Sequence, residues 1–210
     1  MDKFSNRYEA GRMLASQLQA YAKNPDVIVL ALPRGGVPVA SEIAKSLSVP
    51  LDVFIVRKLG VPGHEELAMG AIASGGTVVF NEDIRTQLHI SELAMQKVIQ
   101  AEQQELQRRE VAYRGKKPFP VLKDKIIILV DDGIATGATM RAAIKALKKE
   151  QPKRLVLAVP VAAADTIHEM SKLVDEIVCP LAPYNFYAVG AWYDEFSQTS
   201  DEEVFQLLNH

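Results

Sequence analysis

The fold class is decided by residues 126–140, which read IIILVDDGIATGATM. The stretch starts with an unbroken apolar run, and this is typical of a parallel strand that is covered on both faces. Asp131 and Asp132 end that strand, and small and hydroxyl residues then lead into a helix predicted over 137–149. In an open α/β sheet, ligands bind beyond the carboxyl ends of the strands. We therefore expect a ligand site at this turn.

The turn has the features of a phosphate site beside a site for hydroxyl groups. Free N–H groups and the helix dipole favour a phosphate at a helix N-terminus. The residues whose amides would lie there are Ala135, Thr136, Gly137, Ala138 and Thr139. Asp131 and Asp132 would repel a phosphate, so they are better suited to accept hydrogen bonds from a sugar or to hold hydrated Mg²⁺. The alternative is a solvated strand end with a threonine N-cap, but the whole pattern favours a pocket for a sugar phosphate.

The flanking sequence repeats the alternation of strands and helices. Residues 27–32, VIVLAL, form another unbroken apolar run, and Pro33-Arg34-Gly35-Gly36 leads from it into a helical pattern. Strands are predicted over 27–32, 52–58, 125–130, 155–159 and 177–179, and helices over 5–22, 37–47, 137–149 and 165–173. This order predicts an α/β fold with a doubly wound parallel sheet and helices on both faces.

Several segments depart from this alternation. Residues 59–67 have the composition of a mobile loop, and Gly75-Gly76 predicts a hairpin turn. Residues 91–114 predict one long polar helix, which we interpret as an insertion that projects as an arm or packs against a partner subunit. The aromatic stretch at 180–198 predicts a small hood, and Ser200 with Glu203 predicts the cap of a final helix. No linker divides the chain, so we expect one domain over 1–210.

The composition excludes several classes of protein. The chain has 210 residues, a net charge of −2 and one cysteine, so no internal disulfide can form and a reducing compartment is expected. No apolar run approaches the ~20 residues of a membrane span, and the N-terminus lacks the pattern of a signal peptide. The near-neutral charge argues against a broad footprint on nucleic acid. We expect a cytoplasmic protein without a membrane or nucleic-acid partner.

Residues 130–139 resemble the phosphoribosyl-pyrophosphate (PRPP) motif of type I phosphoribosyltransferases. Other segments fall in the order that this family would give them. Residues 33–36 resemble its pyrophosphate loop, and Arg57-Lys58 with the loop through His64 and Glu65 resembles its flexible catalytic loop. The aromatic tail resembles the hood that covers the base. The resemblance spans most of the chain, with the helix at 91–114 as the exception.

The resemblance implies a reaction in which a nitrogenous base displaces pyrophosphate from PRPP with the help of Mg²⁺. It implies that Asp131 and Asp132 bind the ribose hydroxyls, and contact the metal only through ribose or water. It also implies that residues 135–139 bind the 5′-phosphate and that Lys58 closes over the site during catalysis. The residues implied to bind pyrophosphate are Arg34, Gly35, Gly36, Arg57 and Lys58. A non-proline cis peptide near Arg34 and a homodimer are expected as well.

The acceptor base is the open part of this hypothesis. Ala135 stands where relatives that act on 6-oxopurines carry an acid, so a hypoxanthine or guanine enzyme is disfavoured. Tyr187 could stack on a base and Asp194 could bind an exocyclic group, although aromatic residues in such a tail more often pack against the sheet.

Two alternatives to an enzyme stay open. The first is a regulatory protein that senses PRPP or a nucleotide on the same fold without turnover. The second is a regulator that binds RNA through a local basic face, formed by Arg108, Arg109, Arg114, Lys116 and Lys117.

Overall fold

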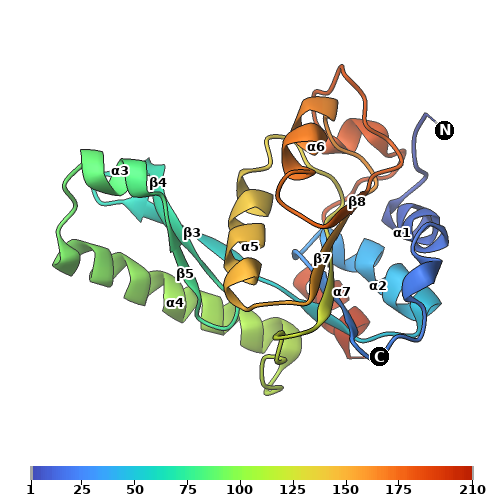
Figure 1. The fold of residues 1–210 in the computed structure, drawn as a ribbon, viewed down its shortest axis with the longest axis horizontal. Coiled ribbons are helices and arrows are strands. Elements are labelled where there is room, and N and C mark those ends of the chain that lie inside the picture. The colour runs from blue at the N-terminus through green and yellow to red at the C-terminus, as the bar shows by residue number, and fades with distance from the viewer. Residues whose placement is uncertain (1, 210) are drawn as a thin grey trace.

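The centre of the molecule is a five-stranded parallel sheet with the order β2-β1-β6-β7-β8, seen in a computed structural model that describes residues 2–209 (Figure 1). The strands are β1 (Val27–Ala31), β2 (Leu51–Val53), β6 (Ile126–Val130), β7 (Arg154–Ala158) and β8 (Glu176–Val178). Strands β1 and β6 are buried along their whole lengths, as their unbroken apolar runs predict. They pair in register from Val27 opposite Ile126 to Ala31 opposite Val130.

Helices cover both faces of this sheet, which confirms the predicted α/β fold class. The helices of the sheet domain are α1 (Arg7–Ser16), α2 (Gly36–Leu47), α5 (Ala138–Lys149), α6 (Ala164–Met170) and α7 (Asp201–Leu208). Successive side chains of a strand point to opposite faces. Val29 therefore packs on the face of α1, α2 and α7, and Leu30 packs on the opposite face with α5 and α6 (Figure 1).

The strand order places a crevice between β1 and β6. From β1 the chain passes through α2 to β2 on one side, whereas β6 lies on the other side and continues to β7 and β8. The connections that leave the carboxyl ends of β1 and β6 therefore diverge, and ligands bind at such a switch point in open α/β sheets. Residues 33–36 and 131–137 are these two connections.

Residues 56–114 form an arm that projects to one side of the parallel sheet (Figure 1). It consists of an antiparallel sheet of β3 (Val56–Val61), β4 (His64–Ala73) and β5 (Val78–Phe80), followed by α3 (Glu82–Gln87) and α4 (Glu92–Arg114). Helix α4 runs from the far end of the arm back to the parallel sheet. The excursion is thus larger than the helix at 91–114 that the sequence predicted, although that helix itself is confirmed.

Two predictions in this region are wrong. The strand expected at 52–58 is divided at Phe54 and Ile55, because β2 belongs to the parallel sheet and β3 to the arm. The loop expected at 59–67 lies instead largely within β3 and β4, which turn at Pro62 and Gly63. Leu59 and Val61 are buried in β3, and this alternation of apolar residues stabilises the strand despite the charged and glycine neighbours.

Several local signals are confirmed. The Gly75-Gly76 turn joins β4 to β5, and both glycines have φ near +85° as a tight hairpin turn requires. Ser200 caps α7 through its side chain as predicted, and the structure shows that Ser91 caps α4 in the same way. The expected helix at 5–22 is shorter, since α1 ends at Ser16 and only a 3₁₀ turn, η1 (Gln19–Tyr21), follows. None of the helices within residues 2–209 is long and apolar enough to cross a membrane.

Residues 180–198, which the sequence predicts to form a hood, lie against the turn after β6 through Val189 and Tyr193, and we call this segment the hood. The segment contains a second 3₁₀ turn, η2 (Val189–Trp192). It is tied to the start of the chain, because the Phe4 amide donates to the Trp192 carbonyl at 3.0 Å. Phe4 and Tyr193 are both buried and their rings lie 5.7 Å apart. The hood therefore packs as a separate small cluster beside α1.

Candidate active site

Two adjacent carboxylates lie at the carboxyl end of β6. The Asp132 amide donates to Asp131 Oδ1 at 2.8 Å, and Arg7 Nε donates to Asp132 Oδ2 at 3.1 Å. Burial raises the pKa of both aspartates, and the charge of Asp132 raises that of Asp131 further, whereas Arg7 opposes the shift at Asp132. A cation or several hydroxyl donors would stabilise the charged form of this pair.

The loop after β1 lies directly against the carboxylates. A Cβ atom on Gly35 would fall 2.1 Å from Asp132 Oδ2, so only glycine allows this close approach. The Pro33–Arg34 peptide bond is cis, as expected. The Gly36 amide donates to the Leu32 carbonyl at 3.1 Å, so it would have to leave this bond to reach a pyrophosphate.

The Arg34 side chain is turned toward the C-terminal helix. Its Nη1 lies 3.5 Å from Oδ1 of Asp201, in the first turn of α7. The same carboxylate oxygen accepts a hydrogen bond of 2.8 Å from the Tyr113 hydroxyl on α4. Arg34 is therefore paired with a carboxylate at the site where the sequence predicts a pyrophosphate.

The predicted phosphate loop lines a pocket of about 240 Å³ beside Asp131. Gly137 caps α5 with φ +84°, and the exposed residues around it are Ala135, Thr136, Ala138 and Thr139. Thr166 Oγ1 donates to the Ala135 carbonyl at 3.0 Å, and Arg141 Nη1 donates to the Thr136 carbonyl at 2.8 Å. These two bonds hold the carbonyl side of the loop in place, and the loop leads directly into the N-terminus of α5.

Arg57 and Lys58 contact or lie near Glu102 and not Asp131 or Asp132. Arg57 Nε donates to Glu102 Oε2 on α4 at 2.8 Å. Lys58 is exposed on β3 and lines a different pocket, of about 340 Å³, with Glu65 and Glu102. Their predicted contact with pyrophosphate therefore stays a prediction.

The hood reaches the site through residues other than those predicted to bind a base. Tyr187 is 96% exposed and Asp194 is also exposed. Val189 covers Gly133, where a Cβ atom would lie 2.5 Å from Val189 Cγ1. The Tyr193 hydroxyl donates to the main-chain carbonyl of Asp132 at 2.6 Å. Tyr187 and Asp194 are therefore free to meet a ligand, and base binding by them stays a prediction.

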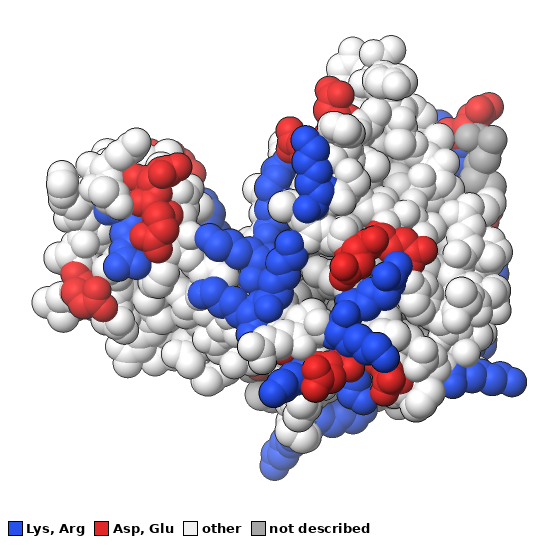
Figure 2. Space-filling view, viewed as in Figure 1, with Lys and Arg blue, Asp and Glu red and all other residues white. Residues whose placement is uncertain are grey.

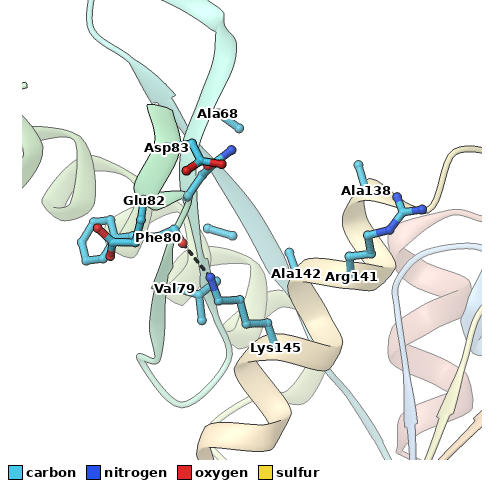
Figure 3. A pocket seen from close by; sticks show the side chains of 12 residues that line it. Ala68, Val79, Phe80, Glu82, Asp83, Ala138, Arg141, Ala142 and Lys145 are labelled. Carbon is cyan, nitrogen blue, oxygen red and sulfur yellow. Dashed lines mark hydrogen bonds between the residues drawn. The ribbon is translucent and has the colours of Figure 1, made fainter. Parts of the chain in front are cut away.

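A groove between the arm and α5 continues from the phosphate loop (Figure 3). Its volume is about 410 Å³, and Ala138 belongs to both pockets. Lys145 crosses the groove and donates to the Phe80 carbonyl at 2.6 Å. Lysine and arginine side chains gather over α5 beside this hollow (Figure 2). The sequence alone does not indicate this groove, because its two walls are far apart in the chain.

The protein groups fit a magnesium ion that is shared with a substrate. Residues 2–209 contain no cluster of three or more histidine, cysteine or acidic side chains that could hold a metal ion. Mg²⁺ prefers six oxygen ligands and commonly keeps water and substrate phosphates among them. Asp131 and Asp132 could supply the protein part of such a set, and the indirect magnesium contact expected from the sequence stays a prediction.

Three of the five cations that the sequence suggested for RNA binding form ion pairs with acidic residues. Arg108 and Arg109 both donate to Glu105, and these bonds lower the pKa of the Glu105 carboxyl to about 2. Arg114 is 4% exposed and donates to Asp52 at 2.6 Å. Arg114 therefore does not belong to an exposed basic face, whereas Arg108, Arg109, Lys116 and Lys117 remain at the surface, and RNA binding stays an untested alternative.

The chain is similar to known proteins along its length. It matches the family described as "Phosphoribosyl transferase domain" over residues 2–194. It is 46% identical over 209 residues to the Mycobacterium tuberculosis H37Rv protein named "Putative phosphoribosyl transferase Rv0571c", with 100% of this chain and 47% of that protein covered. The chain thus spans about half the length of the curated relatives it matches.

Solved structures give the same result for the fold. TT1426 from Thermus thermophilus is 38% identical with a TM-score of 0.84, and the match covers 98% of this chain and 97% of that one. AQ2163 from Aquifex aeolicus is 15% identical with a TM-score of 0.50, over 88% of this chain and 78% of that one, and shares the fold alone.

Proposed function

This chain belongs to the phosphoribosyl transferase domain family, and on that premise we propose that it moves a 5-phosphoribosyl group from PRPP to a nitrogenous base and releases pyrophosphate. One observation carries the proposal. The loops after β1 and β6 meet at the switch point of the sheet, with Gly35 against Asp132 and the phosphate loop beside Asp131. A phosphorylated sugar with a second anionic group needs such a meeting of two loops and two carboxylates.

Each part of the site has a role in the proposed reaction. Asp131 and Asp132 accept hydrogen bonds from the ribose hydroxyls, and the amides of residues 135–139 bind the 5′-phosphate. Arg34 and the amides of the loop after β1 stabilise the charge that develops on the departing pyrophosphate. Asp131 and Asp132 would help to hold Mg²⁺ with the substrate, and a bound Mg²⁺ would supply positive charge that stabilises the leaving pyrophosphate.

The proposed acceptor is a base that lies under the hood. Tyr187 is exposed and able to stack on a ring, and Asp194 can accept a hydrogen bond from an exocyclic amine. The hood backbone around η2 contacts Phe4, and Val189 packs on Gly133, so the segment that carries the two side chains lies against the turn after β6.

The test is the release of pyrophosphate from PRPP and Mg²⁺ in the presence of purine, pyrimidine and pyridine bases. We expect pyrophosphate to be released only when one class of base is present. Asp132→Asn should lower the rate of this release at least about tenfold. Glu202→Gln, which removes an exposed carboxylate from α7, is the matched control and keeps the wild-type rate. Absence of turnover with every base contradicts the proposed transferase.

A sensor that binds PRPP without turnover is the second candidate, and the position of Lys58 favours it. A sensor needs no closing lysine, and Lys58 lines a pocket on the α4 side of the arm. Calorimetry with PRPP and Mg²⁺ separates the two functions. Binding without base-dependent turnover supports the sensor, whereas the absence of both binding and turnover contradicts both functions.

A further inference from the structure

The arginine at the start of α1 lies between the carboxylate pair and the hood. Arg7 Nε donates to Asp132 Oδ2 at 3.1 Å, and its Nη1 donates to the Ser197 carbonyl at 2.6 Å. The guanidinium carbon lies 3.9 Å from the ring centre of Phe196. Only 11% of the Arg7 side chain and 14% of the Asp132 side chain are exposed. One side chain therefore contacts a site carboxylate and two residues of the hood.

Arginine is suited to this position for a chemical reason. Its planar guanidinium carries five donors in a fixed geometry and stacks on aromatic rings, whereas a lysine ammonium is a compact charge without a flat face. Hydrogen bonds between ionised groups are about twice as strong as neutral ones, and partial burial protects the pair from screening by solvent. Removal of Arg7 would leave the Asp132 carboxylate partly buried without this partner.

The contacts continue from Arg7 to the centre of the hood. The Phe196 ring packs against Gly190 in η2, where a Cβ atom would lie 2.8 Å from Phe196 Cδ1. Phe196 also stacks on Tyr193 with ring centres 5.0 Å apart, and the Tyr193 hydroxyl donates to the carbonyl of Asp132. The hood is thus joined to Asp132 twice, through Arg7 at the carboxylate and through Tyr193 at the main chain.

We propose that Arg7 is a positioning residue that fixes one oxygen of Asp132 for the sugar and couples occupation of the sugar site to closure of the hood. The inference rests on the proposed binding of PRPP and adds a residue that acts through Asp132. With Oδ2 held by Arg7, Oδ1 is the oxygen of Asp132 that is left to accept a hydrogen bond from the sugar. A ligand that changes the position of Asp132 changes the contacts of Arg7 with Ser197 and Phe196, and so changes the packing of η2.

The chain provides its own reporter for this coupling. Trp192 is its only tryptophan, lies in η2 and stacks on Phe186 with ring centres 6.4 Å apart. Quenching of Trp192 fluorescence by acrylamide therefore measures how tightly the hood is packed. Arg12→Gln is the matched control, because Arg12 is on the same helix and is 59% exposed in a pair with Glu42.

The experiment compares wild type, Arg7→Gln and Arg12→Gln in PRPP binding by calorimetry and in Trp192 quenching with and without PRPP and Mg²⁺. We expect wild type and Arg12→Gln to bind PRPP with a decrease in quenching. Arg7→Gln should bind about tenfold more weakly, with stronger quenching that PRPP no longer changes. The proposal would be overturned if Arg7→Gln bound PRPP as tightly as wild type, or if PRPP changed Trp192 quenching in Arg7→Gln as much as in wild type. So would PRPP binding to wild type without any change in quenching.

Two further variants keep the test decisive. If Arg7→Gln does not fold, Arg7→Lys replaces it, since one ammonium cannot hold Asp132 and Ser197 together while it stacks on Phe196. We expect acrylamide to quench Trp192 more strongly in Arg7→Lys than in wild type. Quenching equal to that of wild type overturns the proposal. If wild type binds no PRPP, the proposed function fails, and Asp132→Ala then tests the coupling alone. Stronger Trp192 quenching in that ligand-free variant supports the link to the hood, and unchanged quenching overturns it.

Discussion

At the scale of single residues, Gly35 sets how closely the two loops of the site approach. Its φ of −62° and ψ of −28° suit any residue, so Gly35→Ala tests the missing Cβ atom without backbone strain. The new Cβ would lie 2.1 Å from Asp132 Oδ2, and either the loop or the carboxylate has to move. We expect PRPP affinity to fall about tenfold or more, as misplaced site groups commonly cause.

The same variant should remain folded. Overpacking of this kind typically lowers the free energy of unfolding by about 1–3 kcal/mol, which urea denaturation measures. Calorimetry with PRPP then reports the site in the folded protein. Wild-type affinity in a folded Gly35→Ala protein would show that the contact between the two loops is not needed for binding.

Cys179 gives a second prediction for a single residue. Burial raises the pKa of its thiol to about 11, and its Sγ donates to the Leu181 carbonyl at 3.4 Å. The thiolate is the reactive form, so alkylation by iodoacetamide at pH 8 should be roughly a hundredfold slower in the native protein than in urea. The rate in the native protein should still rise between pH 9 and pH 11. An alkylation rate that stops rising near pH 9 would contradict the raised pKa of the Cys179 thiol.

At the scale of elements, the end of α4 is held by a buried ion pair. Arg114 is 4% exposed and donates to Asp52 on β2 at 2.6 Å and to the Pro118 carbonyl at 2.7 Å. Removal of one partner of a buried pair leaves the other charge uncompensated. Arg114→Met should therefore lower the free energy of unfolding by about 3 kcal/mol in urea denaturation.

The exposed arginine pair on the same helix is the control for this prediction. Arg108 donates to Glu105 at 2.6 Å on the surface of α4, where water screens the charges. Arg108→Met is expected to unfold at the same urea concentration as wild type. Equal destabilisation by the two substitutions would contradict a special role for the Arg114 pair.

The elements that the sequence predicted well are those with strong local signals. The unbroken apolar runs of β1 and β6 indicate strands that are buried on both faces, and Ser91 marks the start of α4. The hairpin of β3 and β4 was missed because His64, Glu65 and their neighbours are exposed and polar. The hairpin pairs Leu59 with Gly70 and Gly60 with Ala68, and helix α4 packs on it, so part of its stability comes from residues outside 59–67.

At the scale of the whole molecule, the unpredicted part of the site consists of long-range pairs. The sequence singled out Asp131, Asp132 and residues 135–139, because each lies beside a strand end with a local pattern, and their binding roles stay predictions. Arg7 is 125 positions from Asp132, and nothing near residue 7 indicates that partner. Arg34 was correctly placed in the loop after β1, but its contact with Asp201 depends on how the C-terminal helix packs.

That contact gives a prediction that joins three distant parts of the chain. Asp201 on α7 lies 3.5 Å from Arg34 and accepts a hydrogen bond from Tyr113 on the arm. Its charge opposes the binding of a pyrophosphate by Arg34, and the pair is solvent-accessible, with 36% of Arg34 and 65% of Asp201 exposed. Asp201→Asn should therefore tighten the binding of pyrophosphate about two- to fivefold, the range expected for an exposed ion pair.

Whether pyrophosphate binds more tightly or more weakly to Asp201→Asn distinguishes two roles of Asp201. Calorimetry with pyrophosphate and Mg²⁺ at low and high salt measures the affinity. The increase in affinity should be smaller at high salt, because salt screens the charges. Glu202→Gln removes the neighbouring charge on the same turn of α7 and should leave the affinity for pyrophosphate close to that of wild type, since no contact joins it to Arg34 in the described structure. Weaker binding in Asp201→Asn would instead mean that the carboxylate holds Arg34 in its binding position.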